Sequence, residues 1–370
     1  MSPWLQRPNI LITGAAGYMY DLMLPTVSVN TDARNSGGSV VAALLSENTH
    51  FLENKLFAAV RTEEQVQALQ PLDINVLQLN LQDEQKVVEI VLQNEIDIVV
   101  HIASSIDFRL ALYLVLALGK RRAVTAKDTY FIHALTPGQS SVTTGYSKEG
   151  GWPYGTIKDG DKVYKLEKEL NDGFPIRVTN TAITELAKEQ RVTSFIVGVP
   201  FLSQNIPATV KASMKLKAVY KFDEDSNFAA VHISDLAEYY VLFIKKILQG
   251  EKLPSGEVGY YFSVAHEAGW WDMTASLATV LYDRGLVTKP TVQIWPSDDV
   301  AADALDLPRQ FVRLMHTARV TIDYKNGYPL GWQPKWDEHR LLANMAEEVN
   351  TSLRYDKGRT TLFDTLKPTN

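Results

Sequence analysis

Cysteine is absent from the 370-residue sequence. The absence excludes a disulfide framework, thiolate zinc sites, iron–sulfur clusters and a cysteine nucleophile. It is also typical of a reducing compartment, and residues 1–9 lack the long apolar run of a secretory signal. We therefore expect a soluble, cytoplasmic protein.

Basic residues are slightly fewer than acidic residues. Lys and Arg together number 37 against 43 Asp and Glu, which gives a formal net charge of −6, and no basic block occurs. Nucleic acid is therefore not an expected partner. The most apolar stretch, residues 110–118, is about half as long as a bilayer requires, so we expect no membrane association.

Motifs for several other chemistries are missing. The sequence has no His-Glu-x-x-His pair, no Gly-x-x-x-x-Gly-Lys-Ser/Thr loop and no Gly-x-Ser-x-Gly elbow, and its seven histidines are scattered. No metal site is predicted. Apolar residues make up 45% of the chain and charged residues 22%, which is enough apolar material for a large core.

Short apolar runs alternate with amphipathic, helix-like stretches in the first 200 residues. The runs lie at 9–12, 56–60, 76–79, 97–102, 130–133 and 193–199. Apolar strands that alternate with helices are typical of parallel strands buried on both faces. This pattern predicts an α/β fold built on a doubly wound parallel sheet.

The first apolar run ends in a glycine-rich turn, Thr13-Gly14-Ala15-Ala16-Gly17. Glycine lets the backbone approach a pyrophosphate, and the amides at the start of the next helix can bind it. A turn with two glycines is weak evidence alone, but here it opens a series of alternating strands and helices. The turn therefore predicts a dinucleotide site.

Together with three later segments, this turn resembles the extended short-chain dehydrogenase/reductase family, in particular its fungal epimerase/dehydratase-like members. The segments are 231–237 (Val-His-Ile-Ser-Asp-Leu-Ala), 260–263 (Tyr-Tyr-Phe-Ser) and 330–334 (Leu-Gly-Trp-Gln-Pro). The resemblance covers most of residues 8–350. It implies an NAD(P)-binding Rossmann fold with a smaller, mostly helical C-terminal substrate lobe, and often a homodimer.

The second half of the chain is less regular, with strands expected at 228–233 and 259–265 and helices at 270–285, 308–316 and 336–350. The expected domain boundaries follow from both halves. They are an NAD(P)-binding domain at 8–200, rejoined by 229–265, a substrate lobe at 201–228 and 266–349, and a polar tail at 350–370.

The third glycine of the family's turn is missing from its usual place, where this chain has Tyr20. Removal of residues 20–36 would bring Gly37 to that place, so we interpret 20–36 as an insertion. It is either a retained short intron or a genuine loop beside the pyrophosphate site. The loop after the sixth run is also shorter than in the family, which leaves open a faulty or decaying gene.

The resemblance places the dinucleotide at the ends of successive strands. Arg61, after the second run, suits the 2′-phosphate of NADP(H) and slightly favours it over NAD, although a solvated surface arginine is an equal alternative. His101 is expected to be a buried structural residue. The implied cofactor-binding residues are Gly14, Ala15, Ala16, Gly17, Tyr18, Met19, Gly37, Arg61, Asn80, Leu81, Ala103, Ser104 and Lys168.

The family's catalytic tyrosine and lysine lie four residues apart on one helix, and Tyr164 and Lys168 have that spacing. The lysine would lower the pKa of the tyrosine, which would exchange a proton with the substrate oxygen. Thr136 would polarise the same oxygen.

A competing interpretation of this region comes from the helix-breaking residues Gly173 and Pro175. They separate the helix that carries Tyr164 from a second helix at 178–190. The second helix would then take the place of the family's catalytic helix and leave Tyr164 on the surface.

The leading prediction is an NAD(P)-dependent oxidoreductase or epimerase/dehydratase-like enzyme that acts on a small carbonyl or hydroxyl compound. The alternative is a catalytically silent NADP(H)-binding sensor that regulates a partner. Trp270, Trp271, Trp332 and Trp336 are expected to pack in the substrate lobe, where one of them can face the substrate pocket.

Overall fold

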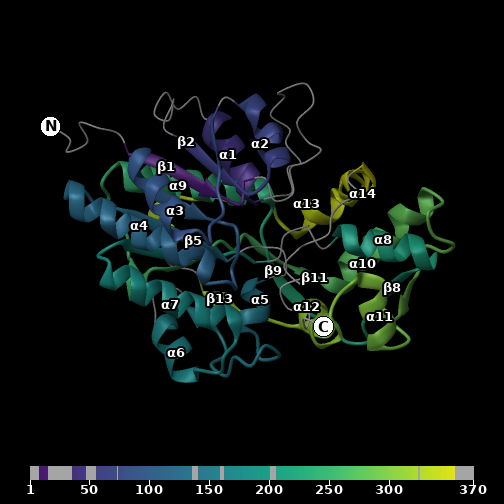
Figure 1. Ribbon diagram of the computed structural model, residues 1–370. Helices are drawn as coiled ribbons and strands as arrows, with labels where there is room; N and C mark the ends of the chain where they lie inside the picture. The colour runs from purple at the N-terminus through teal and green to yellow at the C-terminus, as the bar shows by residue number, and fades with distance from the viewer. Residues whose placement is uncertain are drawn as a thin grey trace, which may run out of the picture.

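The computed structural model describes residues 8–15, 36–46, 56–72, 74–135, 141–158, 162–200, 206–323 and 326–354. Figure 1 shows a domain built on a sheet and, beside it, a smaller helical lobe. The predicted insertion at 20–36 lies outside the described residues except for Ser36, where helix α1 (Ser36–Ser46) begins.

Seven parallel strands form the central sheet, in the order β3-β2-β1-β4-β5-β7-β10. The order reverses between β1 and β4, and in such sheets ligands bind outside the carboxyl ends of the strands at this switch point. The predicted doubly wound parallel sheet is confirmed. The strands are β1 (Asn9–Thr13), β2 (Leu56–Val60), β3 (Asn75–Gln78), β4 (Ile96–His101), β5 (Tyr130–Leu135), β7 (Thr193–Gly198) and β10 (Tyr260–Phe262).

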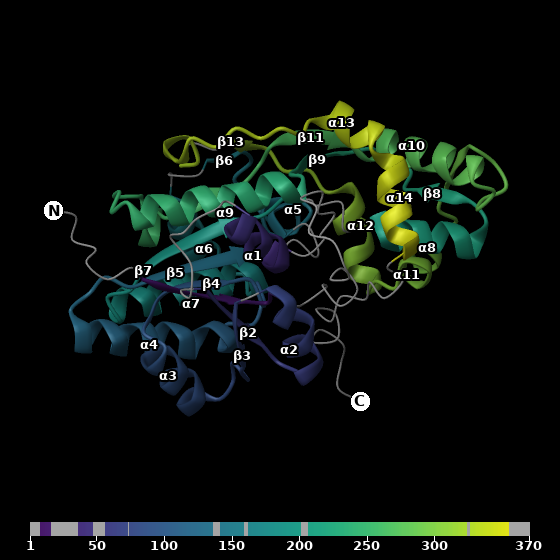
Figure 2. The same ribbon diagram turned by 90° about the horizontal axis from the view of Figure 1, so that it is seen from above.

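Helices cover both faces of the sheet, as Figure 2 shows from above. Both faces of β1 are apolar for this reason, with Ile10 and Ile12 in one core and Leu11 in the other. No helix in the described ranges is long and apolar enough to cross a bilayer. One face carries α1, α2 (Glu63–Leu69) and α9 (Ile233–Leu248), and the other carries α3 (Glu84–Gln93), α4 (Arg109–Thr125) and α7 (Pro175–Glu189).

Two helices lie between β5 and β7 where the sequence predicts a break. Helix α6 (Val163–Leu170) ends at Asn171, which has a left-handed backbone, and α7 begins with Pro175 in its first turn. Figure 1 shows α6 on the far side of α7 from the sheet. Helix α7 packs directly along β7, whereas α6 packs mainly on α7 and touches the edge strand β10 through Glu167. The shorter α5 (Ser141–Tyr146) and β6 (Ile157–Lys158) precede them.

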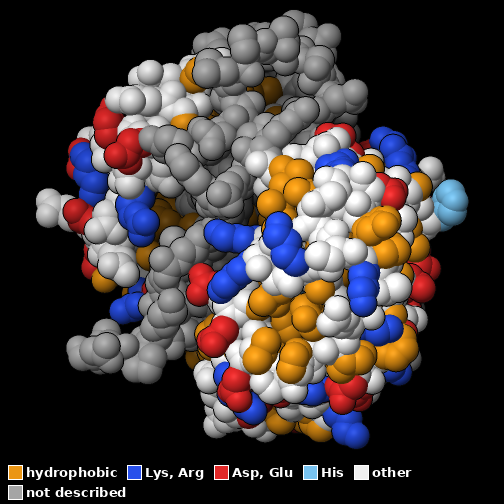
Figure 3. Space-filling model, turned by 90° about the vertical axis from the view of Figure 1, so that its right-hand side faces the viewer, with side chains coloured by type: hydrophobic (Ala, Val, Ile, Leu, Met, Phe, Trp, Pro, Cys, Tyr) orange, Lys and Arg blue, Asp and Glu red, His pale blue; other side chains and the backbone are white. Residues whose placement is uncertain are grey.

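The smaller lobe is mostly helical, as predicted, and contains two apolar cores of its own. On the face shown in Figure 3, Lys, Arg, Asp and Glu side chains are interspersed with hydrophobic ones. The lobe contains α8 (Ile206–Leu216), β8 (Val219–Lys221), α10 (Trp270–Asp283), β12 (Val292–Ile294), α11 (Asp298–Leu305), α12 (Arg309–Thr317), α13 (Glu338–Ala343) and α14 (Met345–Arg354).

Several predicted boundaries in the second half were wrong. The strand expected at 259–265 is β10, which is shorter than expected and belongs to the main sheet. A further strand that was not predicted, β11 (His266–Gly269), follows it and pairs antiparallel with β9 (Asn227–Ala230). The helix expected at 336–350 is two helices, and the polar tail expected from 350 starts later because α14 continues to Arg354. The short strand β13 (Ile322–Asp323), which pairs with β6, was not predicted.

Residues in two of the segments that carry the family resemblance, and the two residues just after the second, form a clasp. The clasp is defined here as His232, Asp235, Trp332, Lys335 and Trp336. The buried carboxylate of Asp235 accepts the backbone N–H groups of Lys335 and Trp336, each at 2.9 Å. The indole N–H of Trp332 donates to the Asp235 carbonyl at 2.9 Å. The rings of His232 and Trp336 stack with centroids 3.5 Å apart. The clasp thus joins the start of α9 to the chain that enters α13.

Loss of the Asp235 carboxylate should destabilise the protein. Asp235→Ala leaves two backbone N–H groups without their acceptor, so we expect the free energy of unfolding to fall by about 2–4 kcal/mol. Glu238→Gln removes only the half-buried carboxylate that pairs with the exposed Lys335 side chain, and should cost less than about 1 kcal/mol. Urea unfolding of both variants measures the two losses in free energy of unfolding. Equal losses would show that the Asp235 carboxylate contributes no more to stability than the ion pair between Glu238 and Lys335.

Candidate functional site

The carboxyl edge of the sheet brings several predicted cofactor residues into one line. Gly14 follows β1, Arg61 follows β2, Asn80 follows β3 by two residues, and Ala103 follows β4 by two residues. Arg61, Asn80 and Ala103 are exposed. They lie on both sides of the switch point, where a doubly wound sheet offers its crevice.

Gly14 permits the close approach of two loops at this switch point. Its φ is +77°, in the left-handed region, and a Cβ at this position would lie 2.9 Å from both Ala103 N and Ile102 C. Any other residue would force the loop after β1 away from the loop after β4. The turn predicted from the sequence therefore requires its first glycine.

For the other predicted cofactor residues, the structure gives only burial, a position or a local contact, or does not describe them. Ala15 is buried, Leu81 is half-buried, and Gly37 lies in the first turn of α1. Ser104 is buried, and its Oγ accepts the N–H groups of Ile106 and Asp107 at 3.3 and 3.1 Å, so it stabilises its own loop. Ala16, Gly17, Tyr18, Met19 and Thr136 lie outside the described residues.

A row of polar side chains crosses the sheet just below this edge. Thr13, His101 and His133 are register partners on β1, β4 and β5. Thr13 Oγ1 lies 2.8 Å from His101 Nδ1, and the two imidazoles stack with centroids 5.6 Å apart. In the part of the chain that the structure describes, neither ring nitrogen of His133 has a hydrogen-bond partner. His101 was predicted from the sequence to be buried, whereas no local signal pointed to His133.

Burial keeps both imidazoles neutral. It lowers the pKa of His101 to about 4, against a smaller raising effect from Asp107. It also lowers the pKa of His133 well below the usual value, and the neighbouring His101 adds to that effect. The polar row is therefore uncharged near pH 7.

Tyr164 and Lys168 do not reach this edge. They lie on α6, where the Tyr164 hydroxyl is 3.2 Å and the Lys168 ammonium 2.5 Å from the same Glu185 oxygen on α7. Glu185 is near the end of α7 that leads to the start of β7, and therefore away from the carboxyl edge. The Lys168 side chain is half exposed. The structure thus favours the competing interpretation, in which the second helix occupies the catalytic helix's place.

Glu167, between these two residues on α6, anchors the helix from its inner face. Its carboxylate accepts the hydroxyls of Tyr146 at 2.6 Å and Tyr260 at 2.5 Å and the amide of Asn180 at 3.0 Å. Burial nevertheless raises the pKa of Glu167 to about 7, although these donors and the nearby Arg177 act in the opposite direction.

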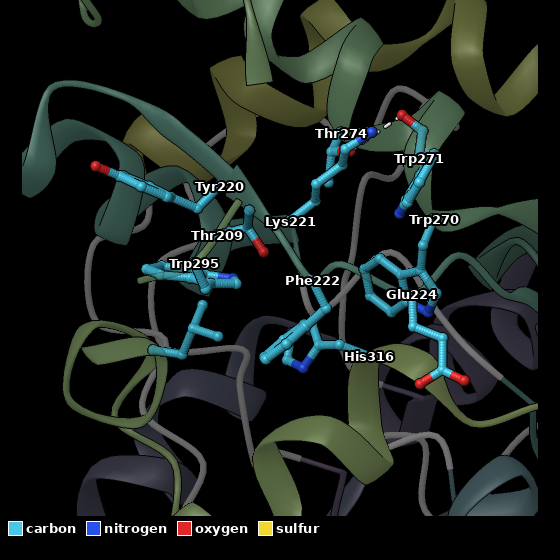
Figure 4. A pocket seen from close by; sticks show the side chains of 11 residues that line it. Thr209, Tyr220, Lys221, Phe222, Glu224, Trp270, Trp271, Thr274, Trp295 and His316 are labelled. Atoms are coloured by element: carbon cyan, nitrogen blue, oxygen red, sulfur yellow. Dashed lines mark hydrogen bonds between the residues drawn. The ribbon is translucent and has the colours of Figure 1, made fainter. Parts of the chain in front are cut away.

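An aromatic pocket in the smaller lobe was not predicted as a unit. Tyr220 of β8, Phe222 just after it, Trp270 and Trp271 of α10, and Trp295 line it together with other side chains (Figure 4). Of these five residues, Trp270 and Trp271 were predicted from the sequence to pack in the substrate lobe, and the packing of the other three was not predicted. The available signal was the density of aromatic residues between 220 and 295.

Comparison with known proteins identifies the fold. No family model matches the chain, and no curated protein matches it. Solved structures do match. UDP-glucose 4-epimerase of Thermotoga maritima, solved with UDP-glucose, is 14% identical with a TM-score of 0.58, over 93% of this chain and 99% of that one.

Two further solved structures show the same likeness. dTDP-glucose 4,6-dehydratase of Bacillus anthracis in complex with NAD is 12% identical with a TM-score of 0.60, over 96% of this chain and 99% of that one. Triphenylmethane reductase of Citrobacter sp. complexed with NADP(H) is 11% identical with a TM-score of 0.57, over 93% and 99%. The chain therefore has the fold of these enzymes, along nearly its whole length.

Glu167 should make stability depend on pH. Its pKa rises from 4.5 to about 7 on folding, so between these values the folded chain keeps a proton that the unfolded chain has released. The free energy of unfolding should therefore fall with rising pH in this window, by at most about 3 kcal/mol relative to Glu167→Gln.

Urea unfolding of wild type and Glu167→Gln from pH 4.5 to 8 tests this expectation. His101 and His133 titrate alike in both proteins, so their effect cancels in the difference. Glu169→Gln changes an exposed side chain of the same helix and serves as the control. A wild-type curve parallel to that of Glu167→Gln would contradict the prediction.

Proposed function

We propose that the chain is an NAD(P)-dependent oxidoreductase or epimerase/dehydratase-like enzyme that acts on a small carbonyl or hydroxyl compound. The observation that carries this proposal is the Gly14 turn at the switch point, with Arg61, Asn80 and Ala103 exposed along the same edge. Similar folds solved with NAD and with NADP(H) support it.

The described residues fit a dinucleotide. Gly14 would let the backbone meet the pyrophosphate, Arg61 would face the 2′-phosphate of NADP(H), and Asn80 would contact the adenine. The bound nicotinamide would supply or accept a hydride. Ala103 and the neutral row of Thr13 and His101 would border the reacting end without adding charge there. A cytoplasmic homodimer belongs to the same proposal.

A second candidate is a catalytically silent NADP(H) sensor. The observation that favours it is the position of Tyr164 and Lys168 on α6, where both contact Glu185 and neither lies at the carboxyl edge. A sensor would bind the dinucleotide along the same edge without needing a proton donor beside the nicotinamide.

Calorimetric titration tests the dinucleotide site directly. NADPH and then NADH are titrated into the full chain and into a variant that lacks residues 20–36. Binding to the full chain supports the proposal and shows that the insertion is tolerated. Binding to neither protein would overturn both candidates.

Arg61 should decide between the two dinucleotides. We expect Arg61→Ser to weaken NADPH binding by about tenfold and to leave NADH binding unchanged, because a charge-assisted contact to the 2′-phosphate is lost. Arg191→Ser, an exposed change away from this edge, is the matched control. Equal loss for both dinucleotides would remove the case for NADP(H).

Tyr164 and Lys168 should be dispensable for turnover. We expect Tyr164→Phe and Lys168→Met each to keep the rate of NADPH oxidation with a carbonyl panel within about twofold of wild type. General acid catalysis contributes about a hundredfold or more, so a loss of that size would return the catalytic role to this pair. A wild-type protein that binds NADPH but turns over no compound of the panel would favour the sensor.

A further inference from the structure

A polar cleft lies between the two-stranded sheet β9–β11 and residues 319–321, which lead into β13. Its volume is about 230 Å³. Figures 1 and 2 both place β9, β11 and β13 near one another. The cleft shares no lining residue with the aromatic pocket. Its volume is below that of sites for drug-sized molecules and suits a smaller ligand.

The cleft lies on the carboxyl side of the central sheet. Strand β10 ends at Phe262, and β11 begins four residues later, at His266. Glu267 of β11 lines the cleft. The cleft is therefore on the same side of the sheet as the proposed dinucleotide site.

Strand register places two polar side chains on one face of the β9–β11 pair. Asn227 is opposite Gly269, which has no side chain to fill the space. Glu267, two residues before Gly269, is opposite Ala229. Asn227 and Glu267 are therefore diagonal neighbours, with Cβ atoms about 7 Å apart. Both are exposed and line the cleft, so one small ligand can contact them together.

The cleft contains charges of both signs. Asp225 and Glu267 supply two carboxylates, and Arg319 supplies a guanidinium group. Among the described residues neither carboxylate has an ion-pair partner. The Arg319 guanidinium donates to the backbone carbonyl of Asp225, which uses one of its several N–H groups. Such a lining matches a ligand that has both a cationic and an anionic group.

A buried hydroxyl of the cleft is unpaired. Ser226 is 1% exposed and lines the cleft. Its Oγ has no hydrogen-bond partner in the described part of the chain. An unpaired buried hydroxyl costs free energy, and a polar group brought by a ligand would recover it. Thr321 adds a second, exposed hydroxyl to the lining.

Two other classes of ligand fit this cleft poorly. No lining residue in the described ranges is aromatic, so a nucleobase or an aryl group finds no ring to stack on. A diphosphate would meet two carboxylates and a single arginine, so repulsion would outweigh attraction.

We propose that this cleft binds a small zwitterionic amino acid whose side chain has a hydroxyl group. Arg319 would bind its carboxylate, and Asp225 and Glu267 its ammonium group. Ser226 and Asn227 would bind the hydroxyl. The inference rests on the proposed function only where it takes this compound as the substrate. In that role the hydroxyl carbon would give a hydride to the oxidised dinucleotide and the hydroxyl would release a proton, which leaves a carbonyl group.

Binding of L-serine to the full chain, measured by calorimetry without dinucleotide, tests the proposal. Ethanolamine lacks the carboxylate, L-glycerate has a hydroxyl in place of the ammonium group, and L-alanine lacks the side-chain hydroxyl. We expect L-serine to bind about tenfold more tightly than ethanolamine or L-glycerate, because each lacks one charge-assisted contact. L-Alanine should bind about fivefold more weakly than L-serine.

Two substitutions should separate the two charged contacts. Arg319→Met should weaken binding of L-serine and L-glycerate about tenfold and leave that of ethanolamine unchanged. Glu267→Gln should weaken binding of L-serine and ethanolamine about tenfold without weakening that of L-glycerate. Both side chains are exposed, so the melting temperature should stay near that of wild type. Glu149→Gln changes an exposed carboxylate that accepts the Arg319 backbone N–H outside the cleft, and as the matched control it should leave all four ligands unaffected.

Ser226→Ala tests the hydroxyl contact. We expect it to remove the preference for L-serine over L-alanine without lowering the melting temperature, because the Ser226 hydroxyl is unpaired among the described residues. A lower melting temperature with an unchanged preference would show that this hydroxyl has a structural role and would contradict the assignment.

Three results would overturn the proposal: no binding of L-serine, binding of ethanolamine or L-glycerate as tight as that of L-serine, or equal effects of Arg319→Met and Glu267→Gln on all four ligands. Dinucleotide binding without L-serine binding refutes this inference alone, whereas the reverse result refutes the proposed function alone. Reduction of NADP⁺ or NAD⁺ by hydroxy amino acids tests their role as substrates, and no reduction when both ligands bind would refute that role.

Discussion

The packing of α7 against the sheet is the contact on which the candidate functional site at the carboxyl edge depends. Ile183 and Ala187 of α7 are buried in one core with Phe131 and Ile196 of the adjacent strands. Helix α7 thus occupies the face of the sheet beside β5 and β7. Helix α6 is therefore left as an outer layer, tied to α7 through Glu167 on its inner side.

The carboxyl edge shows how one glycine and one polar row shape a site. Gly14 allows the loops after β1 and β4 to touch at the switch point. Beneath it, Thr13 and two neutral imidazoles stand where an apolar core would otherwise continue. Since unpartnered buried polar atoms are costly, the unpaired nitrogens of His133 make this row a less stable part of an otherwise apolar sheet.

The smaller lobe depends on long-range contacts with the sheet domain. The buried carboxylate of Asp235 binds backbone about 100 residues away, and β9 pairs with β11 across the 35 residues that separate them in the chain. The β9–β11 pair leads directly into Trp270, which lines the aromatic pocket. The pocket therefore combines side chains from residues 209 to 316 that no local pattern connects.

The sequence by itself determined that the sheet is parallel and doubly wound, that a glycine turn follows β1 and that the second half is mostly helical. These features follow from local periodicity and local backbone freedom, which depend on neighbouring residues and not on distant ones. Only the tertiary structure decided which of two adjacent helices covers the sheet, that Tyr164 and Lys168 contact Glu185, that His133 stacks on His101, and that Tyr220 meets Trp295. Each of these outcomes depends on competition for the same buried space between segments far apart in the chain, and a local pattern does not contain that information.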